Sequence, residues 1–315
     1  MRMKKTVLAF GEVLWDILPT ETVLGGAPCN FIYRINALGE RGIMVSRLGA
    51  DDYGDRASHI LQKMQLDIGM VQRDRRHPTG IVHVSFDEHN NPSYVIVPQA
   101  AYDYIESNEQ LEQAASTADC LCFGTVAQRS EVSRRTLFRL LEQCADGLKV
   151  LDINLRKDCY TQDMVLESLR QADLLKLNED EAAALGDMLD IKTESMPELC
   201  RGLIKEWDLQ YCLVTLEERG AFGISANDEC VYVPGHVVAF EDPLGAGDAF
   251  LAGVVHHLLH GETLAEACAF GNCMGALVCT KSGATEPVYQ RELEELANNR
   301  QSRVVDPRLA QYTIE

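Results

Sequence analysis

A short stretch of the chain, residues 241–250, combines acids, a glycine turn and the start of an apolar helix, and a strand-like run at residues 237–240 leads into it. Gly245 and Gly247 permit a close approach of the backbone to another group. Asp248 follows where a helix would begin, and a helix start favours an anion through its free N–H groups and positive dipole end. Asp is also common at ordinary helix starts. The stretch therefore predicts either a simple helix cap or a carboxylate beside a phosphate site.

Polar residues near the beginning of the chain could hold a small polar ligand. Asp16 interrupts an apolar run that reads as a strand, where its side chain would either face solvent or serve a site. Gly25 and Gly26 bring the backbone close to a neighbour, and Asn30 would lie on the first turn of the following helix. Gly39 is expected to end that helix. A glycine turn alone is a weak signal, so these residues indicate a ligand site only when they are taken together.

Further along the chain, strands and helices are expected to alternate, because short apolar runs are separated by amphipathic patterns. The expected strands are residues 120–123, 150–153, 174–177 and 212–216, and the expected helices are residues 132–144, 164–172, 179–185 and 196–207. This alternation favours a mostly parallel sheet covered by helices on both faces. We expect the 315 residues to form a single α/β domain over residues 1–315.

Polar residues follow several of these strands at the same edge of the expected sheet. In such sheets ligands bind outside the carboxyl ends of the strands. The residues concerned are Asn154, Arg156, Asn178, Glu181, Thr215 and Gly220. Their common placement indicates a ligand site at this edge more strongly than any one of them does.

Two segments stand outside this alternation and predict a small β-sheet lid. Residues 81–86 and 94–97 read as strands around a polar turn, with no helix between them. The strand expected at residues 13–18 is the natural neighbour of this hairpin. We therefore predict a lid formed by residues 12–22 and 78–98.

Composition restricts the partners and the compartment. The formal net charge of −19 argues against nucleic-acid backbones and anionic membranes as partners. The 11 cysteines include no C-x-x-C pair, so neither a zinc ribbon nor a thioredoxin-like motif is supported. The sequence has no secretory signal pattern and no apolar run long enough to span a membrane. These features predict a cytoplasmic protein with reduced thiols.

Two common nucleotide-binding signatures are missing: the chain has neither G-x-x-x-x-G-K-[ST] nor G-x-G-x-x-G between a first strand and helix. Instead, residues 25–30 and 242–250 resemble the N-terminal and C-terminal signatures of the ribokinase-like sugar kinases, the PfkB carbohydrate kinases. Residues 176–181 resemble the N-x-x-E element of that family. The resemblance keeps the order of motifs over nearly the whole chain. The segments most similar to fructokinases are residues 11–16, 101–103 and 152–156.

The resemblance implies a ribokinase-like three-layer sandwich with a mostly parallel central sheet. It also implies an enzyme that transfers the γ-phosphoryl group of ATP to a sugar hydroxyl. This transfer needs alignment, charge neutralisation and a group that accepts the hydroxyl proton. By resemblance Asp248 is that base, and the amides of Gly245, Ala246 and Gly247 form an anion hole for the transferred group.

The resemblance also assigns residues to the sugar and to the nucleotide. Those implied for the substrate are Asp16, Gly26, Asn30 and Arg156, the last of which would contact the sugar or a phosphate. Those implied for ATP are Asn178, Glu181, Thr215, Gly220 and, at the adenine end, Asn272. Asn178 and Glu181 would organise Mg²⁺ through water, which suits a hard cation that keeps several waters.

Many members of the family bind a monovalent cation next to the anion hole. The residues implied for it here are Asp242 through its carboxylate and Leu244, Val278, Lys281 and Gly283 through nearby backbone carbonyls. The resemblance therefore adds K⁺ to ATP and Mg²⁺ as a cofactor to be tested.

Three positions depart from the family pattern. Leu244 stands where Thr or Val is usual, but this position would contribute only its carbonyl. Cys29 replaces a small residue and would make the sugar site sensitive to thiol reagents. Glu217 stands where many relatives have Gly, which would place a negative charge near ATP.

Several functions remain open at this point. We expect a kinase of a ketohexose such as fructose, and the alternative is a 2-keto-3-deoxygluconate kinase, in which Arg156 would meet the substrate carboxylate. A nucleoside kinase is less favoured, because only Trp15 and Tyr102 offer a stacking platform. A non-catalytic sugar-binding protein is disfavoured because Asp248 and its glycines are present. Exposed lid strands are edges that need covering, so a homodimer through the lid is also expected.

Overall fold

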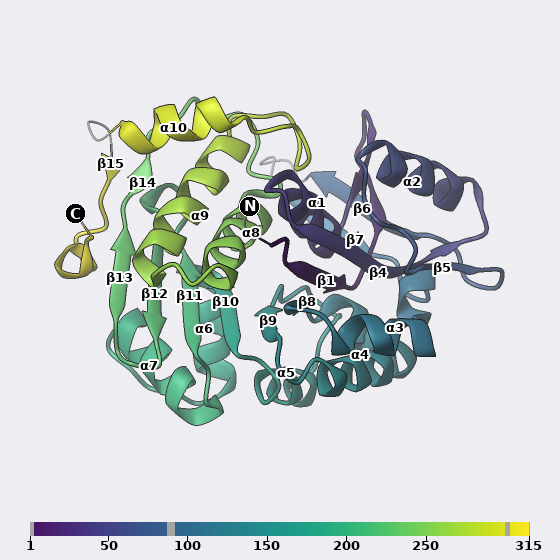
Figure 1. Ribbon diagram of the computed structural model, residues 1–315, viewed down its shortest axis with the longest axis horizontal. Coiled ribbons are helices and arrows are strands. Elements are labelled where there is room, and N and C mark those ends of the chain that lie inside the picture. Colours follow the sequence, from purple (N-terminus) through teal and green to yellow (C-terminus); the bar gives the residue numbers. More distant parts are fainter. Residues whose placement is uncertain (1–2, 87–91, 300–302, 315) are drawn as a thin grey trace.

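A nine-stranded sheet forms the centre of the part of the chain that the computed structural model describes, residues 3–86, 92–299 and 303–314 (Figure 1). In the order of the sheet its strands are β13 (Cys230–Val233), β12 (Ala221–Ser225), β11 (Tyr211–Thr215), β10 (Leu174–Asn178), β9 (Leu148–Asp152), β8 (Cys120–Phe123), β1 (Thr6–Phe10), β4 (Arg41–Gly49) and β5 (Val71–Asp74). β12 runs antiparallel to β11 and β13, and the other neighbours are parallel. The prediction of a mostly parallel sheet is confirmed.

Helices cover both faces of this sheet and complete a three-layer sandwich (Figure 1). One layer contains α1 (Ala27–Ala37), α2 (Asp52–Lys63), α8 (Ala246–Leu259) and α9 (Leu264–Val278), and α10 (Gln290–Asn298) packs on α9. The other layer contains α3 (Glu109–Ser116), α4 (Glu131–Gln143), α5 (Gln162–Leu169), α6 (Glu179–Met188) and α7 (Met196–Trp207). Alternate residues of a strand point to opposite faces. Val7 and Ala9 of β1 therefore pack on the first layer, while Leu8 and Phe10 pack on the second.

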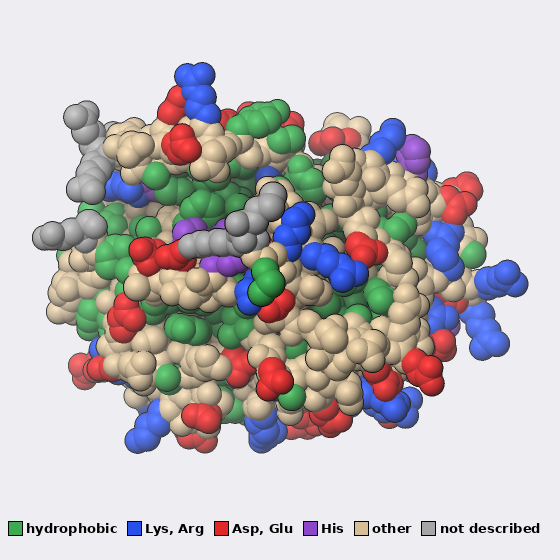
Figure 2. Space-filling view, in the orientation of Figure 1, with side chains coloured by type: hydrophobic (Ala, Val, Ile, Leu, Met, Phe, Trp, Pro, Cys, Tyr) green, Lys and Arg blue, Asp and Glu red, His purple; other side chains and the backbone are tan. Residues whose placement is uncertain are grey.

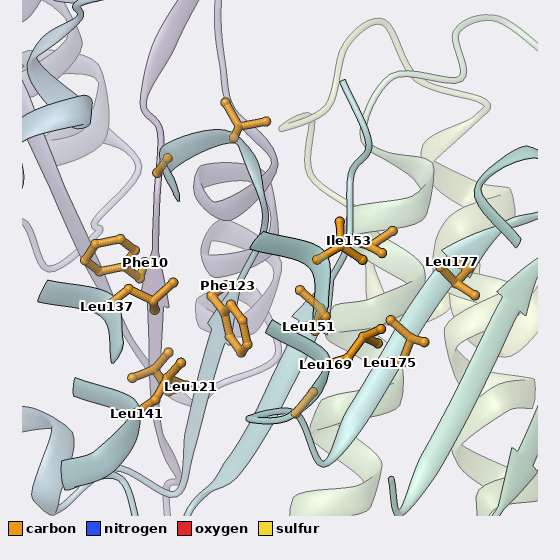
Figure 3. Packing of buried hydrophobic residues seen from close by; sticks show 14 of the residues in the cluster. Phe10, Leu121, Phe123, Leu137, Leu141, Leu151, Ile153, Leu169, Leu175 and Leu177 are labelled. Atoms are coloured by element: carbon orange, nitrogen blue, oxygen red, sulfur yellow. The ribbon is translucent and has the colours of Figure 1, made fainter. Parts of the chain in front are cut away.

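The second helical layer is held to the sheet by a continuous cluster of buried hydrophobic side chains (Figure 3). Leu137 of α4 and Phe10 of β1 belong to this cluster, as do Leu169 of α5 and Leu175 of β10. Full burial of such a side chain contributes about 1.5–3 kcal/mol. The cluster thereby fixes the carboxyl ends of the strands, where the predicted site residues lie.

Four short strands form a second sheet in the described residues, in the order β3 (Thr22–Gly25), β2 (Leu14–Ile17), β6 (Gly80–Phe86) and β7 (Pro92–Ile96). β2 pairs parallel with β6, and the other two pairings are antiparallel. The strand predicted at residues 13–18 is therefore confirmed as the neighbour of the hairpin. β3 was not predicted, and it continues beyond the expected lid boundary at residue 22. Residues 87–91 of the predicted turn lie outside the described residues, and the use of this sheet as a lid stays a prediction.

The strand predicted at residues 237–240 is wrong. β14 (Gly235–His236) ends before this run and pairs antiparallel with β15 (Arg303–Val304). Val237 is 56% exposed and Phe240 is 67% exposed. The apolar residues that indicated a strand thus lie at the surface, without the burial that usually accompanies such a pattern.

Short 3₁₀ helices occupy several loops of the described chain: η1 (Ala101–Tyr104), η2 (Val126–Arg129), η3 (Glu217–Arg219) and η4 (Ala310–Tyr312). Among the helices in the described ranges, none has the length and apolarity needed to cross a bilayer.

Candidate active site

The predicted helix start at the glycine turn is confirmed. α8 begins at Ala246, and Gly245 precedes it with a φ of +77°. A Cβ at Gly245 would lie 2.5 Å from the Cβ of Ala284, so this position requires glycine. The Ala246 N–H donates a hydrogen bond of 3.1 Å to the carbonyl of Pro243. The anion hole expected from Gly245, Ala246 and Gly247 remains a prediction.

Asp248 lies in the first turn of α8 and is buried. Asn30 Nδ2, from the first turn of α1, donates to Asp248 Oδ2 over 2.9 Å. Burial and the nearby Asp152 carboxylate raise the pKa of Asp248 to about 6, while Lys176 and the Asn30 hydrogen bond oppose the rise. A carboxylate with a pKa near neutrality is suited to accept a proton.

A buried ion pair, which sequence reasoning missed, supports the start of α8. Lys176 Nζ donates to Asp152 Oδ1 over 2.9 Å, and both side chains are more than nine-tenths buried. A Cβ at Gly247 would lie 3.1 Å from Lys176 Nζ, so the ammonium lies against the first turn of α8. Burial alone would lower the pKa of Lys176, but Asp152, Glu181 and Asp248 raise it and keep the ammonium charged. A lysine within an otherwise apolar strand was the available signal.

Glu12 is a second residue that sequence reasoning did not single out. It is buried behind the end of β1, and burial raises its pKa to about 7, with a further contribution from Asp248. Gly26 has a φ of +114°, and a Cβ there would lie 2.4 Å from the Glu12 carbonyl oxygen. The predicted close approach of the glycine turn is thus to the backbone of Glu12.

Asp16 and Arg156 lie on the same side of the site. Burial raises the pKa of Asp16 on β2 to about 6, and the Arg156 guanidinium opposes this rise. The same guanidinium also lowers the pKa values of Glu12 and Asp248. Arg156 therefore lies among three acids, and the structure brings it together with the sugar-binding residues predicted from the sequence.

Asn178 and Glu181 form a capping box at the start of α6. The Glu181 N–H donates to Asn178 Oδ1 (2.7 Å), and the Asn178 N–H donates to Glu181 Oε2 (2.9 Å). The second carboxylate oxygen of Glu181 accepts from the Leu155 N–H (3.1 Å), which ties α6 to the loop after β9. Each carboxylate oxygen retains acceptor capacity for a water. The pair therefore fits the predicted contact with a metal ion through water.

The other residues predicted for ATP contact the backbone. Thr215 Oγ1 donates to the Leu177 carbonyl over 3.4 Å, and Asn272 Nδ2 donates to the Pro234 carbonyl over 3.0 Å. Gly220 has a φ of +92°, and a Cβ there would lie 2.0 Å from the Val233 carbonyl oxygen. Glu217 is exposed on η3, so its charge lies at the surface.

The residues predicted for a monovalent cation lie in the loop before α8, at the end of α9 and in the loop that follows α9, and Asp242 joins these segments. Asp242 Oδ1 accepts from the Leu244 N–H (2.9 Å), and Oδ2 accepts from the Gly283 N–H (3.1 Å). The Lys281 N–H donates to the Val278 carbonyl over 2.9 Å. The structure thus brings the Asp242 carboxylate to the loop after α9. Whether these groups hold a cation stays a prediction.

The site lies at the carboxyl edge of the parallel strands, where Glu12, Asn154, Asn178 and Thr215 follow or end β1, β9, β10 and β11. A buried carboxylate at a glycine-lined helix start, within a three-layer sandwich, fits the phosphotransferase class that the sequence resemblance implies. The family model described as pfkB family carbohydrate kinase matches residues 7–291. The chain belongs to this family, and it is a phosphotransferase with an alcohol group as acceptor.

Known proteins match this chain in sequence and in structure over almost the full length of both. The fructokinase of Salmonella typhimurium is 28% identical, over 92% of this chain and 99% of its own. A double mutant of the Vibrio cholerae O395 fructokinase, solved with fructose, ADP and a potassium ion bound, superimposes with a TM-score of 0.81. It is 25% identical over 94% of this chain and all of its own. The 2-dehydro-3-deoxygluconokinase of Thermotoga maritima has a TM-score of 0.82 at 18% identity, covering 94% of this chain and all of its own, and shows the fold alone.

Proposed function

We propose that this protein is an ATP-dependent kinase of a ketohexose, with fructose as the first candidate. The observation that carries the proposal is Asp248, a buried carboxylate held by Asn30 at the start of α8, with a pKa raised to about 6 by burial. The curated fructokinase relatives support the choice of sugar.

In the proposed reaction Asp248 accepts the proton of the sugar hydroxyl. The hydroxyl oxygen then forms a bond to the γ-phosphorus of ATP, and the bond between that phosphorus and the ADP oxygen breaks. The amides of Gly245, Ala246 and Gly247 and the Lys176 ammonium offset the charge on the transferred group. Asp16, Gly26 and Asn30 orient the sugar. Because the base and the anion-binding amides lie on the same turn of α8, they hold the sugar hydroxyl and the γ-phosphate in line with each other.

ATP, Mg²⁺ and K⁺ belong to the same proposal. We assign Asn178, Glu181, Thr215, Gly220 and Asn272 to ATP, with Mg²⁺ reached from Glu181 through water. Mg²⁺ supplies charge neutralisation on the phosphates. K⁺ would be held by Asp242 and the carbonyls of Leu244, Val278, Lys281 and Gly283.

Activity should depend on K⁺ if this cation assignment is right. Replacement of K⁺ by tetramethylammonium at equal ionic strength should lower turnover, because the methyl groups keep a carboxylate and backbone carbonyls from coordinating the charge closely. Asp242→Asn should show low turnover in both salts. Equal wild-type rates in both salts would contradict the assignment.

The environment of Arg156 favours a neutral sugar over 2-keto-3-deoxygluconate. Its guanidinium acts on Glu12, Asp16 and Asp248, so its charge is already opposed by three acids. A substrate carboxylate would compete with these acids for the same cation. Trp15 and Tyr102 are buried, with 1% and 0% exposure, so neither supplies a platform for a nucleoside base.

An ADP-release assay over a panel of acceptors tests the proposed substrate. Fructose should give the highest kcat/KM among fructose, tagatose, ribose, 2-keto-3-deoxygluconate and nucleosides. Asp248→Asn should lower turnover by at least about a hundredfold, the scale of general base catalysis, while ATP binding stays measurable by calorimetry. Faster turnover of 2-keto-3-deoxygluconate would replace the sugar assignment, and full activity of Asp248→Asn would remove the proposed base.

We also propose a cytoplasmic homodimer without nucleic-acid or membrane partners. The net charge of −19 opposes anionic partners, and the 11 free cysteines fit a reducing compartment. The small sheet offers edge strands β3 and β7 for pairing with a second copy.

A further inference from the structure

At the end of α8 distant from Asp248, two histidines share one acid. His256 lies in the last turn of α8 and His260 is its C-cap residue, so the two, four residues apart, lie on the same side of the helix end. Glu40, which lies directly before β4, faces them. Side-chain exposure is 4% for Glu40, 19% for His256 and 8% for His260. Figure 2 shows histidine side chains gathered on this face over the α8–α9 region.

The donor atoms of these three side chains converge. Glu40 Oε1 lies 2.8 Å from His256 Nδ1 and 2.7 Å from His260 Nε2, and all three donor atoms lie within 4.8 Å of one another. The other carboxylate oxygen, Oε2, accepts a hydrogen bond of 2.6 Å from the Lys5 N–H. That bond orients the carboxylate, as outer hydrogen bonds do for carboxylates that bind metal ions.

Two imidazoles and one carboxylate form a donor set suited to Zn²⁺ or Co²⁺. Such ligands bind Zn²⁺ at about 2.0–2.2 Å, which places tetrahedral donors about 3.3 Å apart. The two distances from Glu40 Oε1 to the imidazole nitrogens would lengthen by about half an ångström to admit an ion of this kind. The ammonium of Lys5, the residue whose N–H binds Glu40, is paired with Asp119 over 3.0 Å, which offsets its repulsion of a cation.

We propose that Glu40, His256 and His260 bind one divalent transition-metal ion of the Zn²⁺ type at a site separate from the catalytic centre. The fourth position would be taken by water beside His256, the most exposed of the three. The ion would fasten the C-terminal end of α8 to the segment between α1 and β4. Because Asp248 lies eight residues earlier on α8, about 12 Å along the helix, the ion would also hold the helix that carries the proposed base.

Cobalt binding tests this site with a spectroscopic readout that does not depend on activity. Wild-type protein, freed of metal by chelation and kept in excess Mg²⁺, is titrated with Co²⁺ as the one added transition metal. We expect one Co²⁺ per chain, with visible d–d bands of a nitrogen and oxygen site and no thiolate charge-transfer band. His256→Gln and His260→Gln should each weaken binding at least about tenfold.

His257→Gln provides the matched control, because His257 neighbours the trio on the same helix but its ring contacts Phe270, with a centroid distance of 4.4 Å. This variant should bind Co²⁺ as the wild type does. In a second measurement, Zn²⁺ should raise the unfolding temperature of the wild type and His257→Gln, and much less that of His256→Gln or His260→Gln.

The proposal is overturned if folded wild-type protein binds no stoichiometric Co²⁺ or if a thiolate band accompanies binding. Unchanged affinity in His256→Gln or His260→Gln would overturn it as well. If one variant fails to fold, the other decides, since each removes a different ligand. The two experiments leave the proposed sugar-kinase function untouched, because neither measures phosphoryl transfer.

Discussion

At the scale of single residues, burial raises the pKa values of the acids at the site toward neutral pH. The pKa values of Asp16 and Asp248 are raised to about 6 and that of Glu12 to about 7, with burial as the largest cause in each case. Arg156 opposes all three shifts, and Lys176 opposes that of Asp248. The balance leaves Asp248 ionised at neutral pH yet basic enough to accept a proton.

The pH dependence of kcat/KM should reflect this balance. Asp248 must be deprotonated to act as base, so activity should rise with pH through an apparent pKa of about 6 and fall about tenfold per unit below it. Asp152→Asn should move this limb to lower pH, because the Asp152 charge raises the pKa of Asp248. A profile that stays flat from pH 5 to 7, or a shift to higher pH in Asp152→Asn, would contradict the assignment.

At the scale of elements, tight backbone approaches position the loops around the site. Gly26 lies against the Glu12 backbone, and Gly220 lies against Val233 where η3 meets β12. The Asn178–Glu181 capping box ties the start of α6 to the loop after β9. The elements that carry the predicted ligand residues are therefore fixed to one another by backbone contacts, in addition to the hydrophobic layers.

Gly220→Ala should destabilise the protein much more than Gly39→Ala. Both glycines have a φ of +92°, but a Cβ at Gly220 would lie 2.0 Å from a carbonyl oxygen, whereas a Cβ at Gly39 meets nothing within 4 Å. Gly220 also has a ψ of −134°, a backbone conformation almost restricted to glycine, so strain and the steric contact both act at this position. We expect a difference of at least about 2 kcal/mol in the free energy of unfolding from urea denaturation. Equal losses would show that the Gly220 contact relaxes freely.

At the scale of the whole molecule, the edge strands of the small sheet are the candidates for contact with a second copy of the chain. The large sheet is covered by helices on both faces and ends at β13 and β5, and the small sheet ends at β3 and β7. Val95 on β7 is 57% exposed, which is unusual for a large hydrophobic side chain in this protein. An exposed apolar edge of this kind is stabilised by pairing with another chain.

Light scattering should give about twice the chain mass of 35.0 kDa if the small sheet pairs two copies. Val95→Glu should shift the protein toward the monomer mass, because it places charges of the same sign at the shared edge. Val237→Glu is the matched control, since Val237 is 56% exposed but lies outside the small sheet. A monomeric wild type, or equal dissociation by both variants, would overturn the dimer.

The sequence by itself predicted much of the order of elements and the position of the helix start before Asp248. Apolar periodicity marked β8, β10 and α7, and the pairing of glycines with Asp248 marked the start of α8, because these are local patterns. Local patterns failed at residues 237–240, whose apolar side chains lie at the surface. The unpredicted β3 and the antiparallel β12–β13 pair depend on partners that a single segment does not reveal.

Tertiary structure alone decided which charges meet. The Lys176–Asp152 pair joins neighbouring strands, and Glu40 meets His256 across more than two hundred residues of chain. The raised pKa of Asp248 likewise needs burial by several elements and a carboxylate from β9. Burial and charge proximity are properties of the packed molecule, so no spacing in the sequence could supply them.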